Sequence, residues 1–201
     1  PEMFYDYYGF PEESYSIDYP APGQPQLAGE VAEILRQQGV AAHVDPQRGY
    51  DHGCFVPLKL MYPAADIPCI QVSLLADLDP ERHLRLGEAL GLLRRERVLF
   101  LGSGSSFHNL GSFREPPGGP SRKSNEAFDS WLTATICDRT LDEAERRQRL
   151  LHWSEAPAAR FSHPREEHLL PLHVCYGIAG RPAAEAFSME MMNKRVSAFL
   201  W

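Results

Sequence analysis

The fold class is decided by the stretch Val98-Leu99-Phe100-Leu101-Gly102-Ser103-Gly104-Ser105-Ser106-Phe107-His108-Asn109-Leu110. Its first four residues are apolar and uncharged, which is typical of a strand buried on both faces. The glycines and serines that follow predict a tight turn, because both residue types favour backbone conformations that end regular structure. The turn delivers the imidazole of His108 to the end of the strand, where α/β proteins usually place their chemistry.

Apolar and helical patterns extend this organisation in both directions. Short apolar runs predict strands at 40–44, 67–74 and 196–201, and the proline-rich, aromatic residues 1–25 predict an ordered loop with one short helical turn. Helices are predicted over 24–38, 51–62, 79–96, 124–137, 140–152 and 164–174. This alternation predicts an α/β fold with a three-layer, mixed β-sheet flanked by helices, in a single domain over residues 1–201.

Local signals indicate where several helices begin and what they cover. Asp51 and Asp79 are the expected N-caps, since an aspartate side chain accepts hydrogen bonds from the first free backbone N–H groups of a helix. Pro164, followed by acidic residues, is expected to open the last helix. The helix over 140–152 is highly charged, so it is expected to lie on the surface.

The composition narrows the classes of function. The 201 residues carry a formal net charge of -7, with 43% hydrophobic and 23% charged residues, which is ordinary for a globular domain. The sequence has no stripe of lysine and arginine, so no nucleic-acid partner is expected. No apolar run approaches the roughly 18 residues of a membrane span, and no signal-peptide layout is present, so no membrane partner is expected.

The cysteines argue against a thiol-based site. There are four of them, widely spaced and without a Cys-x-x-Cys pair, so a thiolate zinc site or a redox dithiol is not expected. Each has apolar neighbours and is expected to be a buried, inert thiol: Cys54, Cys69, Cys137 and Cys175. This pattern is typical of a protein in the reducing cytoplasm.

The turn around His108 matches no nucleotide-binding or hydrolase motif. It lacks the Gly-Lys-Ser/Thr ending of a P-loop, and its serines are not centred in a Gly-x-Ser-x-Gly elbow. On this segment alone, His108 has two interpretations: a functional imidazole at a strand end, or a residue that only caps a backbone group.

The other histidines and the aromatic N-terminus leave similar alternatives open. His52 precedes Gly53, which would let a ligand approach the backbone, yet an exposed helix-start histidine without function is the simpler interpretation of that segment alone. His168 or Glu167 could face a metal, or the acids beside them could serve only the helix dipole. The aromatic segment could wall a pocket or form a packed lid. The remaining histidines are expected to be structural or surface residues: His43, His83, His152 and His173.

Taken together and in order, several segments resemble those of one known family. They are Gly9-Phe10-Pro11, Tyr19-Pro20-Ala21-Pro22-Gly23, Asp51-His52-Gly53, Leu60-Met61-Tyr62-Pro63-x-x-Asp66-Ile67-Pro68, Gly102-Ser103-Gly104-x-x-x-His108-Asn109-Leu110 and Pro164-x-Glu166-Glu167-His168-x-Leu170-Pro171-Leu172. The family is the class III extradiol ring-cleavage dioxygenases of the LigB-like superfamily, and the DOPA-dioxygenase-type branch is the most similar. The resemblance runs from about residue 4 to the C-terminal strand.

The resemblance implies a catalytic domain that cleaves the aromatic ring of a catechol, possibly DOPA-like, with O₂ at a non-haem Fe(II) site, or at zinc in some isolated preparations. By the same resemblance, His168 matches a metal ligand, and His108 matches a histidine beside the metal that acts as acid–base and is sometimes counted with the ligands. His52 matches a histidine that orients the substrate and assists proton transfer. In the implied mechanism the metal lowers the pKa of the catechol, oxygen inserts next to the diol, and a lactone hydrolyses to a semialdehyde.

One departure from the family pattern concerns the metal. The family's first two metal-binding histidines lie in a His-Gly-Ser-Pro-like turn and a Ser-x-His-Trp-like strand end near the N-terminus, and neither motif occurs in these 201 residues. Three explanations follow: a cropped form of a complete enzyme, a partner or missing N-terminal segment that supplies both histidines, or a truncated, metal-free relative that serves as a binding or regulatory module. The first is favoured because the downstream motifs are intact in type and order. A metal-dependent hydrolase has no support, since neither a serine nucleophile nor a His-Glu-x-x-His pattern is found.

Overall fold

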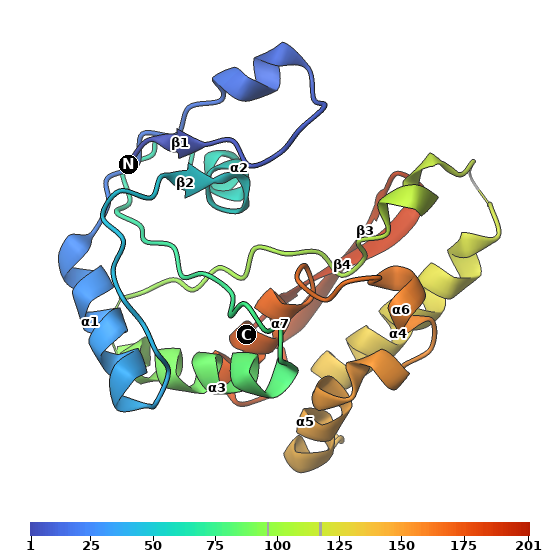
Figure 1. The fold of residues 1–201 in the computed structure, drawn as a ribbon. Coiled ribbons are helices and arrows are strands. Elements are labelled where there is room, and N and C mark those ends of the chain that lie inside the picture. The colour runs from blue at the N-terminus through green and yellow to red at the C-terminus, as the bar shows by residue number, and fades with distance from the viewer. Residues whose placement is uncertain (96, 117) are drawn as a thin grey trace. The chain divides into compact units, whose positions relative to one another are not determined.

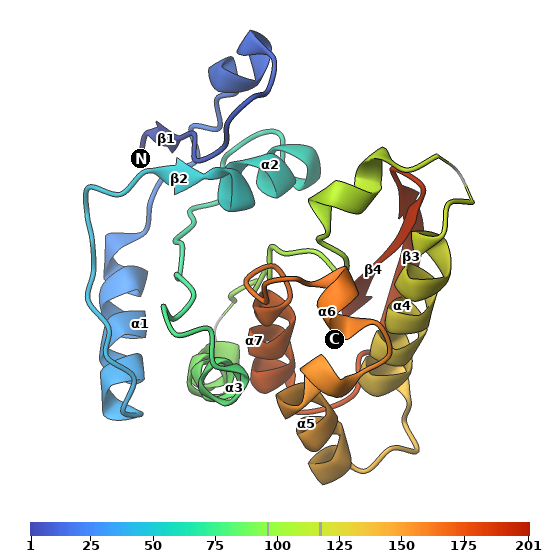
Figure 2. The same ribbon diagram turned by 45° about the vertical axis from the view of Figure 1, so that its right-hand side comes forward.

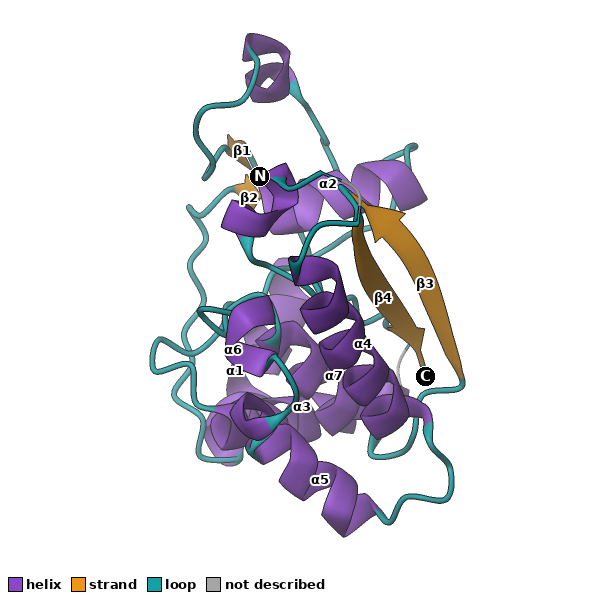
Figure 3. Cartoon of the chain, turned by 90° about the vertical axis from the view of Figure 1, so that its right-hand side faces the viewer, coloured by secondary structure: helices purple, strands orange, loops and turns teal. Residues whose placement is uncertain are grey.

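The structure, a computed structural model, describes residues 1–95, 97–116 and 118–201. Helices and connecting loops make up most of it, with few strands (Figure 3). The chain divides into two compact units, Pro1–Ser73 and Leu74–Trp201. Each unit combines helices with a small sheet, so the predicted α/β class is confirmed.

The first unit combines one short sheet with two α-helices. Its elements are β1 (Met3–Phe4), η1 (Glu12–Ser16), α1 (Pro25–Gln37), β2 (Tyr50–Asp51) and α2 (His52–Met61). The strands β1 and β2 are parallel, with Met3 opposite Tyr50. Tyr19, Tyr50 and Phe55 are buried in the core of this unit. Because β2 leads directly into α2, the sheet positions the first turn of that helix.

The helices with strong local signals lie close to their predicted bounds. At the start of α1, the side chain of Gln24 accepts a hydrogen bond from the backbone N–H of Gln26, and Gly39, with φ of +78°, follows the helix end. Asp79 caps the helix α3 (Pro80–Leu90) as predicted, since its carboxylate accepts a hydrogen bond from the backbone N–H of Arg82 at 2.8 Å. The 3₁₀ helix η1 is the short helical turn expected in the N-terminal loop.

The second unit contains most of the helices and the larger hydrophobic core. Its elements are α3 (Pro80–Leu90), η2 (Gly91–Arg95), η3 (Leu110–Arg114), α4 (Ser121–Cys137), α5 (Glu143–Leu151), η4 (Trp153–Glu155), α6 (Ala159–Ser162), α7 (Leu170–Ala179), β3 (Glu185–Met191) and β4 (Lys194–Leu200). Leu84, Phe128 and Trp153 are among the buried side chains of the core. The helices α3 and α7 pack most closely at Gly87 and Gly177, where a Cβ on either glycine would overlap the backbone of the other helix.

The C-terminal hairpin closes the second unit. β3 and β4 are antiparallel, with Glu185 opposite Leu200, and lie side by side in Figure 1. The turn between them has positive φ at both Met192 and Asn193, as a two-residue hairpin turn requires. β4 packs against α4, which runs along the hairpin (Figure 2). The closing strand predicted at 196–201 is therefore confirmed, whereas its partner β3 lies outside the sequence prediction.

The strands predicted at 40–44, 67–74 and 98–101 are wrong. None of these residues lies in a strand of the described structure, and the only pairing there is an isolated bridge between Gly23 and Cys69. The strands form two separate two-stranded sheets in place of one central mixed sheet. The burial predicted for these segments is wrong too, since Ile67, Val72, Leu99 and Leu101 are exposed in the described structure. Apolar composition favours burial and an extended backbone, whereas a strand also requires a hydrogen-bonded neighbour, which composition does not specify.

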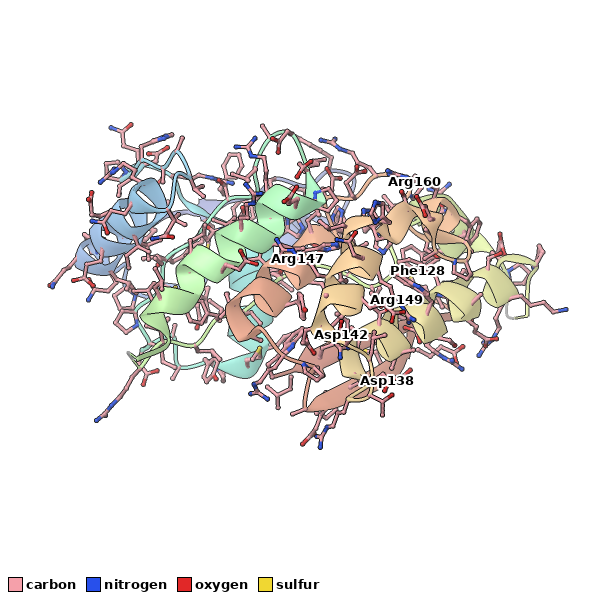
Figure 4. All side chains as sticks on the ribbon, turned by 90° about the horizontal axis from the view of Figure 1, so that it is seen from below. Phe128, Asp138, Asp142, Arg147, Arg149 and Arg160 are labelled. Atoms are coloured by element: carbon pink, nitrogen blue, oxygen red, sulfur yellow. The ribbon has the colours of Figure 1, made fainter. Side chains whose placement is uncertain are left out.

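Arg146 corrects the expectation that the charged helix over 140–152 lies wholly on the surface. Its side chain is 0% exposed, and its guanidinium donates hydrogen bonds to the backbone oxygens of Thr135, Asp138 and Leu141. These oxygens lie at the end of α4 and in the connection to α5, where helical partners run out. Arg149, on the same helix, is 39% exposed (Figure 4).

Other predicted features differ in detail. The last helix begins at Leu170 rather than at Pro164, because residues 164–169 form bends and turns. The predicted end of the third helix at Glu96 lies outside the described residues. Among the cysteines, only Cys54 is buried, and the other three are half-buried. Within the described part of the chain, no helix combines the length and the apolar character needed to cross a bilayer.

Candidate active site

The site in the second unit is built where two chain segments cross. The backbone N–H of Ser105 donates a hydrogen bond to the carbonyl oxygen of His168 at 2.8 Å, and the backbone N–H of His108 donates to that of Ser162 at 2.9 Å. Just before Ser105, Gly104 lies so close to the second segment that a Cβ on it would overlap the carbonyl oxygen of His168. The small residues of the predicted turn therefore allow the two backbones to meet.

This crossing brings two of the predicted site residues together. The imidazole rings of His108 and His168 are stacked, with centroids 3.3 Å apart and planes inclined by 12°. The Nδ1 atom of His168 lies 3.5 Å from a carboxylate oxygen of Glu167. The crossing therefore holds the two imidazoles face to face.

A third, buried histidine forms a hydrogen bond to the segment that carries His108. His163 is fully buried, and its Nε2 lies 3.0 Å from the carbonyl oxygen of Ser106. Since a carbonyl only accepts, Nε2 carries the proton, and the buried Nδ1 has no hydrogen-bond partner among the described residues. Burial lowers the pKa of His163 to about 4, so the ring is neutral at pH 7.

Ser106 also ties the loop to the hairpin. Its Oγ accepts a hydrogen bond from the backbone N–H of Ser197 in β4 at 2.7 Å, and the Ser197 hydroxyl in turn donates to the carboxylate of Asp129 in α4 at 2.6 Å. The side-chain amide of Asn109 donates to the carbonyl oxygen of Phe161 at 2.7 Å. The loop that carries His108 is thus held by α6 and β4, and through Ser197 it is linked to α4.

His52 lies in the first unit, at the first position of α2. Its Nδ1 is 2.6 Å from Oδ1 of Asp6, and the same oxygen accepts a hydrogen bond from the His52 backbone N–H at 3.2 Å. The ring of Tyr7 meets the imidazole edge to face, at a centroid distance of 5.8 Å. His52 therefore has partners of its own within its unit.

The predicted cap of α2 is corrected by this arrangement. Asp51 occupies the N-cap position, but its side chain makes no capping hydrogen bond within the described structure. Its carboxylate instead accepts hydrogen bonds from Arg48 at 2.9 Å and from the side-chain amide of Gln71 at 2.6 Å. Asp6 instead accepts a hydrogen bond from the first backbone N–H of α2, because the pairing of β1 with β2 places Asp6 beside the start of this helix.

The N-terminal aromatic side chains pack against one another. Tyr5 contacts Phe55 edge to face at 5.8 Å between centroids, and Tyr7 contacts Phe10 in the same way at 5.3 Å. The phenol of Tyr5 donates a hydrogen bond to the carbonyl oxygen of Ile17 at 2.8 Å. The segment is thus ordered by its own contacts, and its use as a pocket wall stays a prediction.

The described residues supply part of a metal-binding set. His108 and His168 provide two imidazoles, which are donors that iron and zinc accept. Across residues 1–95, 97–116 and 118–201, no group of three or more His, Cys, Asp or Glu side chains is placed to hold a metal ion. Catalytic non-haem iron rests on three protein ligands, so these two histidines fit a metal site without completing it.

Several functional contacts could not be predicted from local sequence. Asp6 and His52 are 46 residues apart, and His163 and Ser106 are 57 residues apart. No short motif joins either pair, so only the folded backbone brings the partners together. Of the four histidines predicted to be structural or surface residues, His43 and His152 are exposed, and His83 and His173 are buried.

Comparison with known proteins gives one consistent result. The family model described as the catalytic LigB subunit of aromatic ring-opening dioxygenase matches residues 1–199. The chain is 42% identical to Dioxygenase tasH of Hapsidospora irregularis, covering 89% of this chain and 57% of that protein. It is 39% identical to the 4,5-DOPA dioxygenase extradiol of Beta vulgaris, covering 89% of this chain and 65% of that protein.

A solved structure has the same fold. The crystal structure of an uncharacterized protein from Escherichia coli K12 superimposes with a TM-score of 0.74 at 27% identity, covering 91% of this chain and 76% of that one. The chain spans 57% to 65% of the length of the two curated relatives.

Proposed function

The chain belongs to the LigB family of aromatic ring-opening dioxygenases, and we propose that it acts as an extradiol dioxygenase that cleaves the ring of a catechol with O₂. The observation that carries this proposal is the stacked pair of His108 and His168, held 3.3 Å apart by two hydrogen-bonded chain segments. Ring cleavage needs a group that binds the diol through a metal and a group that moves its protons. Two adjacent imidazoles are suited to these two tasks.

We assign different roles to the two histidines. His168 would hold the metal, and His108 would accept and return a proton of the diol and would also be a second candidate ligand. The proposed metal is Fe(II), with zinc as its substitute in isolated protein. Bound Fe(II) would supply the Lewis acidity and the chemistry with O₂. Since these two imidazoles do not complete a three-ligand site among the described residues, we propose that a partner chain or a further N-terminal segment supplies the missing histidines.

We propose a catechol, and specifically a DOPA-like catechol, as the substrate. Relatives from Beta vulgaris, Mirabilis jalapa and Portulaca grandiflora are named 4,5-DOPA dioxygenases. In this proposal His52 contacts the substrate and assists proton transfer. We also propose a cytoplasmic location, because free cysteines are typical of proteins in a reducing compartment.

One observation favours a second candidate function. Because the described residues contain no three-ligand group, the chain would serve as a metal-free binding or regulatory module if no other ligand is supplied. The two candidates differ in their response to Fe(II): the enzyme is stabilised by the metal, whereas the module ignores it.

Turnover on matched diols tests the proposal. The protein expressed from its own gene is loaded anaerobically with Fe(II), and O₂ uptake and semialdehyde absorption are followed with catechol and with L-DOPA. Hydroquinone is the matched control, because its para hydroxyls cannot reach one metal together. The proposal expects turnover of the ortho diols alone. Failure to consume O₂ with either ortho diol, in protein shown to contain iron, would overturn it.

A further inference from the structure

We propose that Asp6 is a positioning residue for His52, which holds the imidazole in the tautomer with its proton on Nδ1 and so presents Nε2 as the proton acceptor. The role of His52 towards a catechol rests on the proposed function. The tautomer itself does not, because it follows from contacts within the first unit. Asp6 acts only through His52 and is not assigned a contact with substrate.

The contacts fix which nitrogen carries the proton. Oδ1 of Asp6 lies 2.6 Å from Nδ1 of His52 and 3.2 Å from its backbone nitrogen. Burial raises the pKa of Asp6, but the hydrogen bonds from the His52 ring and backbone outweigh it, so that pKa lies below its usual value. An ionised carboxylate only accepts hydrogen bonds, so Nδ1 must donate. A neutral imidazole has one N–H, which leaves the lone pair on Nε2.

The surroundings hold this geometry in place. The parallel pairing of Phe4 with Asp51 sets the end of β1 beside the start of α2, and Asp6 follows two residues later. The positive end of the helix dipole favours a carboxylate at this position. The ring of Tyr7 packs edge to face against the imidazole, at an interplanar angle of 87°.

The His52 side chain is partly exposed to solvent, although one of its ring nitrogens is bonded to Asp6. The His52 side chain is 47% exposed, whereas that of Asp6 is 29% exposed. The Nδ1 edge faces the carboxylate, so Nε2 is on the side of the ring away from Asp6. This arrangement matches that of other histidines whose second nitrogen is fixed by a carboxylate, where the carboxylate sets tautomer and orientation.

The neighbouring carboxylate provides a matched control. Asp51 is adjacent to His52 in sequence, but its side chain is engaged by Arg48 and Gln71. Removing the Asp51 carboxylate therefore changes the local charge by the same amount as removing that of Asp6. It leaves the hydrogen bond to Nδ1 in place. A general electrostatic effect would make the two variants alike, whereas a specific positioning role separates them.

The test is the tautomer of His52, read by long-range proton–nitrogen NMR of the full chain, metal-free and labelled with ¹⁵N-histidine. The His52 signals are assigned by their loss in His52→Gln. The wild-type protein and Asp51→Leu are expected to show the proton on Nδ1, and Asp6→Leu to lose that preference. A wild-type ring protonated on Nε2 would overturn the proposal without any variant, so it stays testable even if Asp6→Leu does not fold.

Kinetics separate this inference from the proposed function. In protein that cleaves catechol, Asp6→Leu is expected to lower kcat by about 10- to 100-fold with little change in KM, as for other residues that orient a functional histidine. Asp51→Leu should retain kcat. Equal losses in both variants would contradict the positioning role. If the protein does not cleave catechol but His52 has its proton on Nδ1, the proposed function is wrong and the inference about Asp6 and His52 is still supported.

Discussion

At His163 and His173, burial keeps an imidazole uncharged near neutral pH. Each ring is fully buried and has Nε2 near a backbone oxygen, at 3.0 Å from Ser106 and 2.9 Å from Leu150 respectively. Burial lowers the pKa of both from 6.5 to about 4. Between these values the unfolded chain binds protons that the folded chain does not.

This difference predicts a loss of stability in acid. The free energy of unfolding should be at its full value above about pH 6.5 and fall as the pH drops towards 4, by on the order of 3 kcal/mol for each histidine. Urea unfolding measured across this range checks it. His163→Gln should flatten the dependence, while the exposed His152→Gln should not. A wild-type stability that is constant from pH 6.5 to 4 would contradict the assignment.

At the scale of elements, the contact between α3 and α7 depends on two glycines. A Cβ at Gly87 would overlap the carbonyl oxygen of Val174, and one at Gly177 would overlap that of Leu84. We therefore expect Gly87→Ala to push the helices apart and to lower the free energy of unfolding by about 1–3 kcal/mol.

Gly29→Ala in α1 is the matched control, since no described atom lies within 4 Å of the added Cβ. It should raise the free energy of unfolding by about 0.5–1 kcal/mol, because alanine loses less backbone entropy in a helix. Thermal denaturation of both variants gives the comparison. If the two substitutions shift stability in the same direction, the close helix contact is not what requires Gly87.

Arg146 supports the connection between α4 and α5. Replacing it by Met would leave three backbone oxygens without their donor, at about 1 kcal/mol or more each, so a loss on the order of 3 kcal/mol is expected. Arg149→Met, which removes an exposed pair with Glu145, should cost less than about 0.5 kcal/mol. Chemical unfolding distinguishes these outcomes, and a small cost for Arg146→Met would show that water replaces its hydrogen bonds.

The contrast between helices and strands shows what local sequence can predict. The helices α1 and α3 are each marked by an adjacent cap residue and by their own apolar periodicity, so the sequence predicted both. The segments 40–44, 67–74 and 98–101 have strand-like composition, but strand pairing depends on residues far away in sequence. In β3, Phe187, Met189 and Met191 alternate with polar residues, which is a strand pattern that the sequence prediction missed, although no residue of β3 is buried.

At the scale of the whole molecule, the candidate site could be predicted only in part. Motifs in family order predicted His52, His108 and His168 as site residues, and the stacking of the last two follows from the folded crossing of their segments. The supporting contacts of Asp6 and His163 join positions 46 and 57 residues apart, so no motif contains them. Short motifs can therefore indicate candidate site residues, whereas the contacts that support those residues are known only from the fold.

The central claim is that His108 and His168 act as one unit on a metal-bound catechol. The measurement that tests it most directly is a double-mutant cycle on kcat/KM for Fe(II)-dependent catechol cleavage, with His108→Ala, His168→Ala, the double variant and His152→Ala as control. We predict losses of at least about 100-fold in each single variant, no further loss in the double variant, and no effect at His152. Turnover that survives either single substitution, or losses that add in the double variant, would contradict the claim.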